Sequence, residues 1–107
     1  MHPSIEPILT ELKAGLQALY GDGLAQVILY GSYARGDFHD ESDIDVLVVL
    51  RAEKISSYGE IKRMSPFVTD LDIRYGVLIS ILPVSERYFE TSWMPVYAEI
   101  RKEGVRL

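Results

Sequence analysis

The sequence predicts an α/β (α+β) fold in which helices pack against one small mixed β-sheet. Three observations support it: an amphipathic helical pattern opens the chain, two short apolar stretches flank a polar loop, and helical and extended patterns then alternate. The resulting order is helix, strand, strand, helix, strand, helix, which suits a sheet covered by helices. We expect residues 1–107 to form a single domain, because a chain of this length is too short for a second core.

The first half of the chain supplies one helix and two strands. Apolar residues recur at steps of three and four over the first twenty positions, so a helix is expected over about 4–20, ended by Gly21–Gly23. A short buried strand is expected over 27–30. The next strand, over 44–50, is so uniformly apolar after its second residue that we expect both of its faces to be covered.

The second half alternates helices with one strand. Ser57 and Glu60 fit a capping box at the start of a long helix, which Pro66 interrupts either as a kink or as the first residue of a new helix. The elements expected here are a helix over about 58–74, a strand over 77–84, a short helix capped by Ser85 and reaching Phe89, and a last helix over 95–103.

Composition and charge exclude several classes of protein. A net charge of −5 argues against a non-specific nucleic-acid binder, which needs a basic face. The longest apolar runs are far too short to cross a membrane. The absence of cysteine rules out disulfides and thiolate metal sites. Residues 1–4 also lack the pattern of a leader peptide, so we expect a cytoplasmic protein.

The most informative motif joins a small-residue turn to a pair of carboxylates. Gly31 and Ser32 directly follow the first strand, and Asp43 and Asp45 come after ten intervening residues, at the start of the second strand. Either half alone is typical of an ordinary turn or a solvated strand start. Together they predict a site that holds the phosphates of a nucleotide and the accompanying Mg²⁺, and hence nucleotidyl transfer.

Each residue of this motif has a chemical reason to be there. Residues two apart on a strand share a face, so Asp43 and Asp45 are expected side by side, where they repel each other unless a cation lies between them. Mg²⁺ takes carboxylate oxygens and shares its remaining positions with water and phosphate. Gly31 lets the backbone approach the phosphates, Ser32 offers a hydroxyl, and Arg35 is a candidate phosphate contact, although a loop arginine is as often simply solvated.

With Tyr33-Ala34-Arg35-Gly36 after the serine, segment 30–49 resembles the minimal nucleotidyltransferases of the DNA polymerase β-like superfamily, and the ending 100–105 is similar too. The resemblance implies a polymerase β-like nucleotidyltransferase fold with ATP as substrate. Gly31 and Ser32 would hold the triphosphate, and Asp43 and Asp45 would bind Mg²⁺ in two-metal chemistry. Many members are antitoxins encoded beside a HEPN-domain ribonuclease toxin. They neutralise the toxin by complex formation, and some transfer AMP to one of its tyrosines.

The chain departs from the family pattern at a third carboxylate, which usually opens the strand predicted over 77–84. We assign the matching position to Gly76. Asp72 would become the third metal ligand if that strand began earlier, because residues 72, 74 and 76 would then share a face. Glu86, beyond the far end of the strand, is a weaker candidate. With two carboxylates alone, nucleotide binding could persist while transfer slows or stops.

Three functions therefore stand side by side. The first is an enzyme that adenylylates a toxin tyrosine, and the second is an antitoxin with a degenerate nucleotide site that acts by binding alone. The third, less favoured, is half of a two-piece transferase for a small molecule. Either a hetero-oligomer or a homo-oligomer is compatible with the sequence.

The sequence allows two interpretations for several other residues. His39, in the loop before the carboxylates, could touch a phosphate, although a solvated loop histidine is the more common case. Tyr33 and Phe38 could stack on a base or pack against a partner. A further aromatic set could form core or a partner surface: Tyr88, Phe89, Trp93 and Tyr97.

Overall fold

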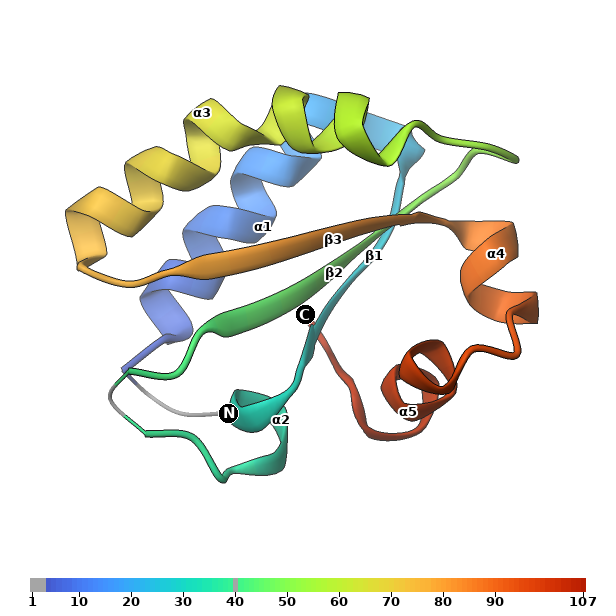
Figure 1. The fold of residues 1–107 in the computed structure, drawn as a ribbon. Coiled ribbons are helices and arrows are strands. Elements are labelled where there is room, and N and C mark those ends of the chain that lie inside the picture. The colour runs from blue at the N-terminus through green and yellow to red at the C-terminus, as the bar shows by residue number, and fades with distance from the viewer. Residues whose placement is uncertain (1–3, 40) are drawn as a thin grey trace.

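A four-stranded mixed sheet forms the centre of the molecule in the computed structural model, which describes residues 4–39 and 41–107 (Figure 1). Residues 1–3, on which the leader-peptide expectation partly rests, lie outside the described part. The elements are α1 (Glu6–Tyr20), a 3₁₀ turn (Gly21–Gly23), β1 (Leu24–Tyr30), α2 (Ser32–Arg35), β2 (Ile44–Leu50), α3 (Ser57–Tyr75), β3 (Ile79–Ser85), α4 (Glu86–Thr91), α5 (Pro95–Glu103) and β4 (Val105–Arg106).

The strands lie in the order β3-β2-β1-β4, with both parallel and antiparallel pairs. β1 and β2 are antiparallel, β2 and β3 are parallel through the α3 crossover, and β4 is antiparallel to β1 at the other edge. The fold class expected from the sequence is confirmed. In the part of the chain that the structure describes, no helix is both long and apolar enough to cross a lipid bilayer.

The two faces of the sheet are covered unequally. α1 and α3 pack together over one face, where their apolar residues meet alternate residues of the strands, such as Val46 and Val48. On the other face, α4 and α5 cover only part of the sheet and pack on residues such as Leu47 and Val49 (Figure 1). Side chains alternate between faces along a strand, so Asp45 belongs to this second face, in the part that α4 and α5 leave open.

Most predicted elements form close to their expected bounds, and the differences have local causes. The cap of α3 is Ser56 rather than Ser57, and its hydroxyl accepts the N–H of Gly59 at 3.1 Å. Pro66 lies inside one continuous α3. Pro66 has no backbone N–H, so the carbonyl of Lys62 loses its helical hydrogen bond. The helix tolerates this loss because both residues lie on its exposed side. β4 is an addition that two residues of sequence do not predict.

Asp72 lies at the end of α3 and forms a hydrogen bond to the outer edge of the sheet. α3 runs to Tyr75 and β3 begins only at Ile79, so the strand does not start early enough to include Asp72. Instead, Asp72 Oδ1 accepts the N–H of Ile79 at 2.9 Å. The condition under which Asp72 would become a third metal ligand is therefore not met, and its carboxylate satisfies a backbone donor on the exposed edge strand.

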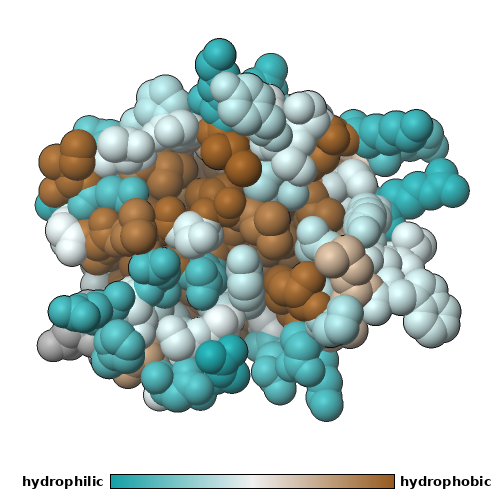
Figure 2. Space-filling view, in the orientation of Figure 1, coloured by the Kyte–Doolittle hydropathy of each residue, from teal (hydrophilic) through white to brown (hydrophobic). Residues whose placement is uncertain are grey.

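Hydrophobic side chains gather along this edge, over β3 and α3 (Figure 2), around a shallow groove that includes Ile61, Met64 and Ile81. The Leu78 carbonyl accepts a hydrogen bond from Ile44, so the backbone groups of Ile79 and Pro83 point away from β2. The N–H of Ile79 already donates to Asp72, and Pro83 has no backbone N–H. Such devices limit pairing of an edge strand with another chain.

Candidate active site

The turn after β1 depends on a glycine. Gly31 has φ 74° and ψ −152°, a region of backbone space that is essentially restricted to glycine. A Cβ on Gly31 would lie 2.3 Å from Oδ2 of Asp45, so a side chain here would also displace that carboxylate. The chain then enters α2, a short helix that begins at Ser32. Gly31 therefore brings the Ser32 turn against the start of β2.

The pairing of β1 with β2 fixes the position of Asp45. Tyr30 and Asp45 are direct partners in this antiparallel pair, so their side chains share the open face of the sheet. Burial raises the pKa of the Asp45 carboxyl, the negative charge of Asp43 raises it further, and the positive charge of Arg35 opposes both. Burial and the charge of Asp45 in turn raise the pKa of the Tyr30 hydroxyl. The site thus concentrates negative charge that Arg35 only partly offsets.

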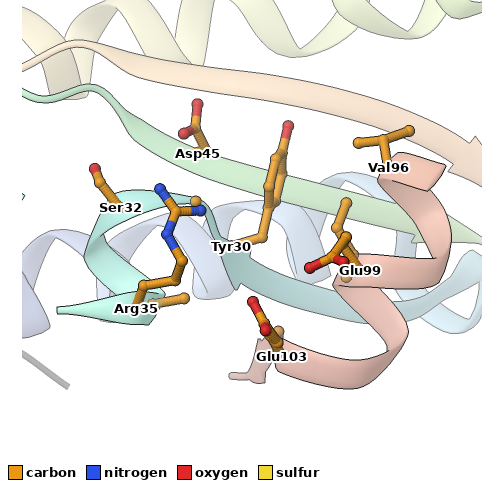
Figure 3. Close-up of a pocket in the computed structure, with 11 residues that line it drawn as sticks. Tyr30, Ser32, Arg35, Asp45, Val96, Glu99 and Glu103 are labelled. Carbon is orange, nitrogen blue, oxygen red and sulfur yellow. The ribbon is translucent and has the colours of Figure 1, made fainter. Parts of the chain in front are cut away.

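Two hollows meet at this turn. The first, here called the loop pocket, has a volume of about 490 Å³, and every described residue that lines it is polar or charged, including Ser32, Arg35, His39, Asp43 and Asp45. The second, here called the α5 pocket, has a volume of about 510 Å³ and is lined by Ser32, Arg35 and Asp45 again, together with Tyr30, Val96, Glu99, Ile100 and Glu103. Figure 3 shows this second hollow between α2 and α5.

The structure brings together the residues of the predicted motif. Ser32, Arg35, Asp43 and Asp45 line the loop pocket, and Gly31 lines the α5 pocket beside them. Arg35 also donates from Nε to Asp37 Oδ2 at 3.2 Å, an exposed ion pair that holds its side chain near the site. Within the described ranges, no group of three or more His, Asp or Glu side chains is arranged to hold a metal ion.

Gly76, the position assigned to a third carboxylate at the start of a strand, does not open β3. Gly76 ends α3 in the left-handed conformation, with φ 65°, and lies before β3. In the parallel register of β2 and β3, the residue beside Asp45 is Ser80, which is exposed on the same face. Glu86 comes after the opposite end of β3, which lies about 17 Å along the strand from Ser80. A hydroxyl rather than a carboxylate therefore lies next to Asp45.

The remaining sequence candidates divide between local structure and exposed surface. Tyr33 and Phe38 stack on each other, with ring centroids 4.5 Å apart. The Nδ1 atom of His39 accepts the backbone N–H of Glu41, and the backbone N–H of His39 donates to the hydroxyl oxygen of Ser42. These hydrogen bonds shape the loop before β2. His39 also lines the loop pocket.

The aromatic set of the C-terminal part contains both core and surface residues. Phe89 and Tyr97 are buried and pack edge to face, with centroids 6.3 Å apart. Tyr88 is partly exposed and also packs edge to face on Tyr97. Trp93, in the connection between α4 and α5, is 97% exposed. The core interpretation therefore holds for Phe89 and Tyr97, and the surface interpretation fits Trp93.

Several residues at the site were not singled out from the sequence, among them Tyr30, Glu99 and Glu103. Tyr30 could have been found from an antiparallel register of the two strands, which places it opposite Asp45. The two glutamates are four apart and share one face of α5. Nothing local in the sequence reveals which face of α5 meets the Ser32 turn, because that depends on how the helix packs on the sheet.

Replacing Gly31 by alanine tests the close approach to Asp45. We expect Gly31→Ala to lower the free energy of unfolding by at least about 2 kcal/mol, from backbone strain and contact with the carboxylate. In an Asp45→Ala background the cost should shrink, because the nearest atom is gone. Gly36→Ala is the control: Gly36 has φ 84° but open space around it, so its cost should be the same in both backgrounds. Urea unfolding of the six proteins would contradict this account if the two alanine substitutions behaved alike.

Replacing Asp45 by asparagine tests the cost of an ionised carboxylate that is partly buried beside Asp43. A raised pKa means that the folded state binds the Asp45 proton more tightly than the unfolded chain, so stability is lost as the pH rises through that pKa. In metal-free buffer, Asp45→Asn should therefore raise the melting temperature by a few degrees at pH 7. The gain should shrink as the pH is lowered toward about 4. Asp22→Asn, at an exposed turn, should show no such gain, and an equal gain for both variants would contradict the assignment.

Comparisons with known proteins agree with this geometry. The family described as a nucleotidyltransferase domain matches residues 9–97. The chain is 31% identical over 100 residues to "Putative protein adenylyltransferase MJ0141" of Methanocaldococcus jannaschii, covering 94% of this chain and 95% of that protein.

Solved structures share the fold. A "putative minimal nucleotidyltransferase" superposes with a TM-score of 0.60 at 25% identity, over 99% of this chain and 98% of that one. A toxin–antitoxin structure with AMP-PNP superposes with a TM-score of 0.61 at 17% identity, over 89% of this chain and 68% of that one. The family match covers most of the sequence, including the Gly31–Ser32 turn and both aspartates, and so this chain belongs to the nucleotidyltransferase domain family.

Proposed function

We propose that this chain is an antitoxin that binds Mg-ATP and transfers AMP to a tyrosine of a HEPN-domain ribonuclease toxin. The observation that carries the proposal is the close approach of the Gly31 turn to Asp45, which joins a phosphate-binding turn to a carboxylate pair. A cytoplasmic location belongs to the same proposal.

The phosphates of ATP are proposed to lie in the loop pocket. The Ser32 hydroxyl can donate to a phosphate oxygen there, and the Arg35 guanidinium supplies a positive charge. Gly31, which lines the adjoining α5 pocket, lets the backbone approach the phosphates closely. Arg35 is half-exposed and already near Asp45, so it can reach a phosphate without reorganising the fold.

The carboxylate pair fits a divalent cation. Asp43 and Asp45 offer the oxygen ligands that Mg²⁺ prefers. Burial, and then the charge of Asp43, raise the pKa of Asp45, and a cation would offset both effects by favouring the ionised carboxylate. Mg²⁺, when bound, would neutralise the triphosphate and the developing charge on pyrophosphate. The exposed hydroxyl of Ser80 beside Asp45 can add a neutral oxygen, as serine and threonine hydroxyls do at other Mg-nucleotide sites.

The proposed transfer has a simple balance of bonds. The tyrosine oxygen bonds to the α-phosphorus while the bond from that phosphorus to the bridging oxygen of pyrophosphate breaks. The hydroxyl proton is released to solvent. The protein's part is to orient ATP with Gly31, Ser32 and Arg35 and to hold the acceptor in line, because phosphoryl-type transfer depends mainly on positioning and electrostatics.

A protein acceptor and a toxin partner are supported by the relatives and by the surface. One relative carries the name of a protein adenylyltransferase, and one structural neighbour is a toxin–antitoxin assembly. Trp93 and Met94, which are exposed just before α5, are residue types that often anchor protein interfaces.

A second candidate is an antitoxin that acts by binding alone. The observation that favours it is Ser80, which stands where a third carboxylate would lie beside Asp45. In that case the nucleotide site has become degenerate, and neutralisation depends only on the complex with the toxin.

The mass of the toxin separates the two candidates. The chain is co-expressed with the product of its neighbouring gene, which the proposal takes to be the HEPN toxin, as wild type and as Asp43→Ala/Asp45→Ala, and the intact mass of that purified product is measured. We expect one or more added AMP groups with wild type and none with the double variant. The double variant should stay folded, because removing two clustered negative charges relieves repulsion.

Asp22→Ala/Glu90→Ala, which removes two exposed carboxylates elsewhere, should modify the toxin as wild type does. An unmodified toxin that co-purifies with wild type and with the Asp43→Ala/Asp45→Ala variant alike would replace the enzyme by the binding-only antitoxin.

A further inference from the structure

The α5 pocket adjoins the loop pocket through shared residues. Ser32, Arg35 and Asp45 line both hollows, so a molecule whose phosphates contact Ser32 can extend into the space under α5 without crossing another part of the protein. Figure 3 shows Ser32, Arg35 and Asp45 on one side of this space and Val96, Glu99 and Glu103 of α5 on the other. A nucleotide held at the Ser32 turn therefore has a hollow beside it of a size that suits a small organic group.

The chemistry of the lining differs between the two hollows. The described lining of the loop pocket is polar throughout and suits phosphates with a cation. The α5 pocket adds apolar groups, namely Val96, Ile100 and the ring of Tyr30, together with two carboxylates. A triphosphate would be repelled by those carboxylates, whereas a nucleoside offers an aromatic base to the apolar wall and hydroxyl and amine donors to the carboxylates.

Glu99 and Glu103 are placed to accept such donors. They lie one turn apart on α5, and both carboxylates point from the helix toward the side where Arg35 and Ser32 lie (Figure 3). Within the described part of the chain, neither side chain forms a hydrogen bond or ion pair with another residue. Their accepting oxygens are therefore available to a ligand.

The wall that carries these glutamates is held firmly on the sheet. A Cβ on Gly104, at the end of α5, would lie 2.5 Å from Cγ2 of Ile28, so only glycine allows the helix end to pack this closely on β1. Arg101 donates to the carbonyls of Phe89 and Ser92, which ties α5 to α4. The α5 pocket is thus a preformed feature, which reduces the ordering cost of binding.

We propose that the α5 pocket binds the nucleoside half of the nucleotide, with Glu99 and Glu103 accepting hydrogen bonds from its hydroxyl or amine donors and Val96, Ile100 and Tyr30 contacting the base. This inference rests on the proposed function, because it takes the phosphates to lie at the Ser32 turn. It makes Glu99 and Glu103 the residues that determine which nucleotide is bound.

Calorimetric titration with two probes tests the assignment. Each protein is titrated with ATP and with inorganic tripolyphosphate, both with Mg²⁺, because tripolyphosphate keeps the phosphates and lacks the nucleoside. Wild type should bind ATP at least about tenfold more tightly than tripolyphosphate. Glu99→Ala/Glu103→Ala should weaken ATP about tenfold and should leave tripolyphosphate unchanged or slightly tighter, because two repelling charges are removed. Glu90→Ala, on α4, should change neither affinity.

A second variant fills the space instead of removing the acceptors. Val96 is partly exposed, so Val96→Trp can place a large ring over the α5 pocket while the fold is kept. It should weaken ATP and spare tripolyphosphate. On wild type, 2′-deoxy-ATP, 3′-deoxy-ATP and inosine triphosphate identify the donor: at least one of these analogues should lose about as much affinity as the double glutamate variant loses for ATP.

The outcomes separate this inference from the proposed function. If wild type binds neither Mg-ATP nor Mg-tripolyphosphate, the proposed nucleotide site itself is wrong, and this inference falls with it. If wild type binds both probes equally, or the glutamate variant changes both affinities in the same direction, the nucleoside does not occupy the α5 pocket although the phosphate site stands. Equal affinity of wild type for ATP and all three analogues would likewise overturn the role of the glutamates.

Discussion

The antiparallel register of β1 and β2 is the constraint on which the rest of this structure depends. It pairs Tyr30 with Asp45, so the turn that follows β1 arrives at the carboxylate that opens β2. Only glycine fits at that contact, because its conformation is closed to other residues and a Cβ would lie 2.3 Å from Asp45 Oδ2. A slip of one residue would turn Asp45 into the core and Val46 to the site.

The unequal covering of the sheet turns this contact into a usable site. α1 and α3 cover one face of the sheet and form the larger part of the hydrophobic core with it. On the other face, α4 and α5 leave the start of β2 open. Ionised Asp45 costs stability in the free protein, because burial and then the charge of Asp43 raise its pKa. Sites that bind a cation and phosphates commonly contain clustered charges that lower the stability of the free protein.

Much of the fold was predictable because its signals are local. The bounds of β2 and α5 follow directly from an apolar run and from a proline and a glycine at the helix ends. The motif residues Gly31, Ser32, Asp43 and Asp45 were also evident, because their spacing within one segment carries the information. The partner of Asp45 on β3 was not, since the β2–β3 register is set across a long crossover. The same limit hid Glu99 and Glu103, whose place at the site depends on the packing of α5.

The central claim is that Asp43, Asp45 and the Gly31–Ser32 turn hold the metal and the triphosphate of one nucleotide. The most direct test is a crystal structure with Mn²⁺ and a non-hydrolysable ATP analogue, with the metal located by its anomalous scattering, because Mn²⁺ takes the same oxygen ligands as Mg²⁺. The account predicts a peak at the carboxylates of Asp43 and Asp45, with the triphosphate against Gly31 and Ser32. An ordered analogue whose phosphates and Mn²⁺ lie elsewhere would contradict it.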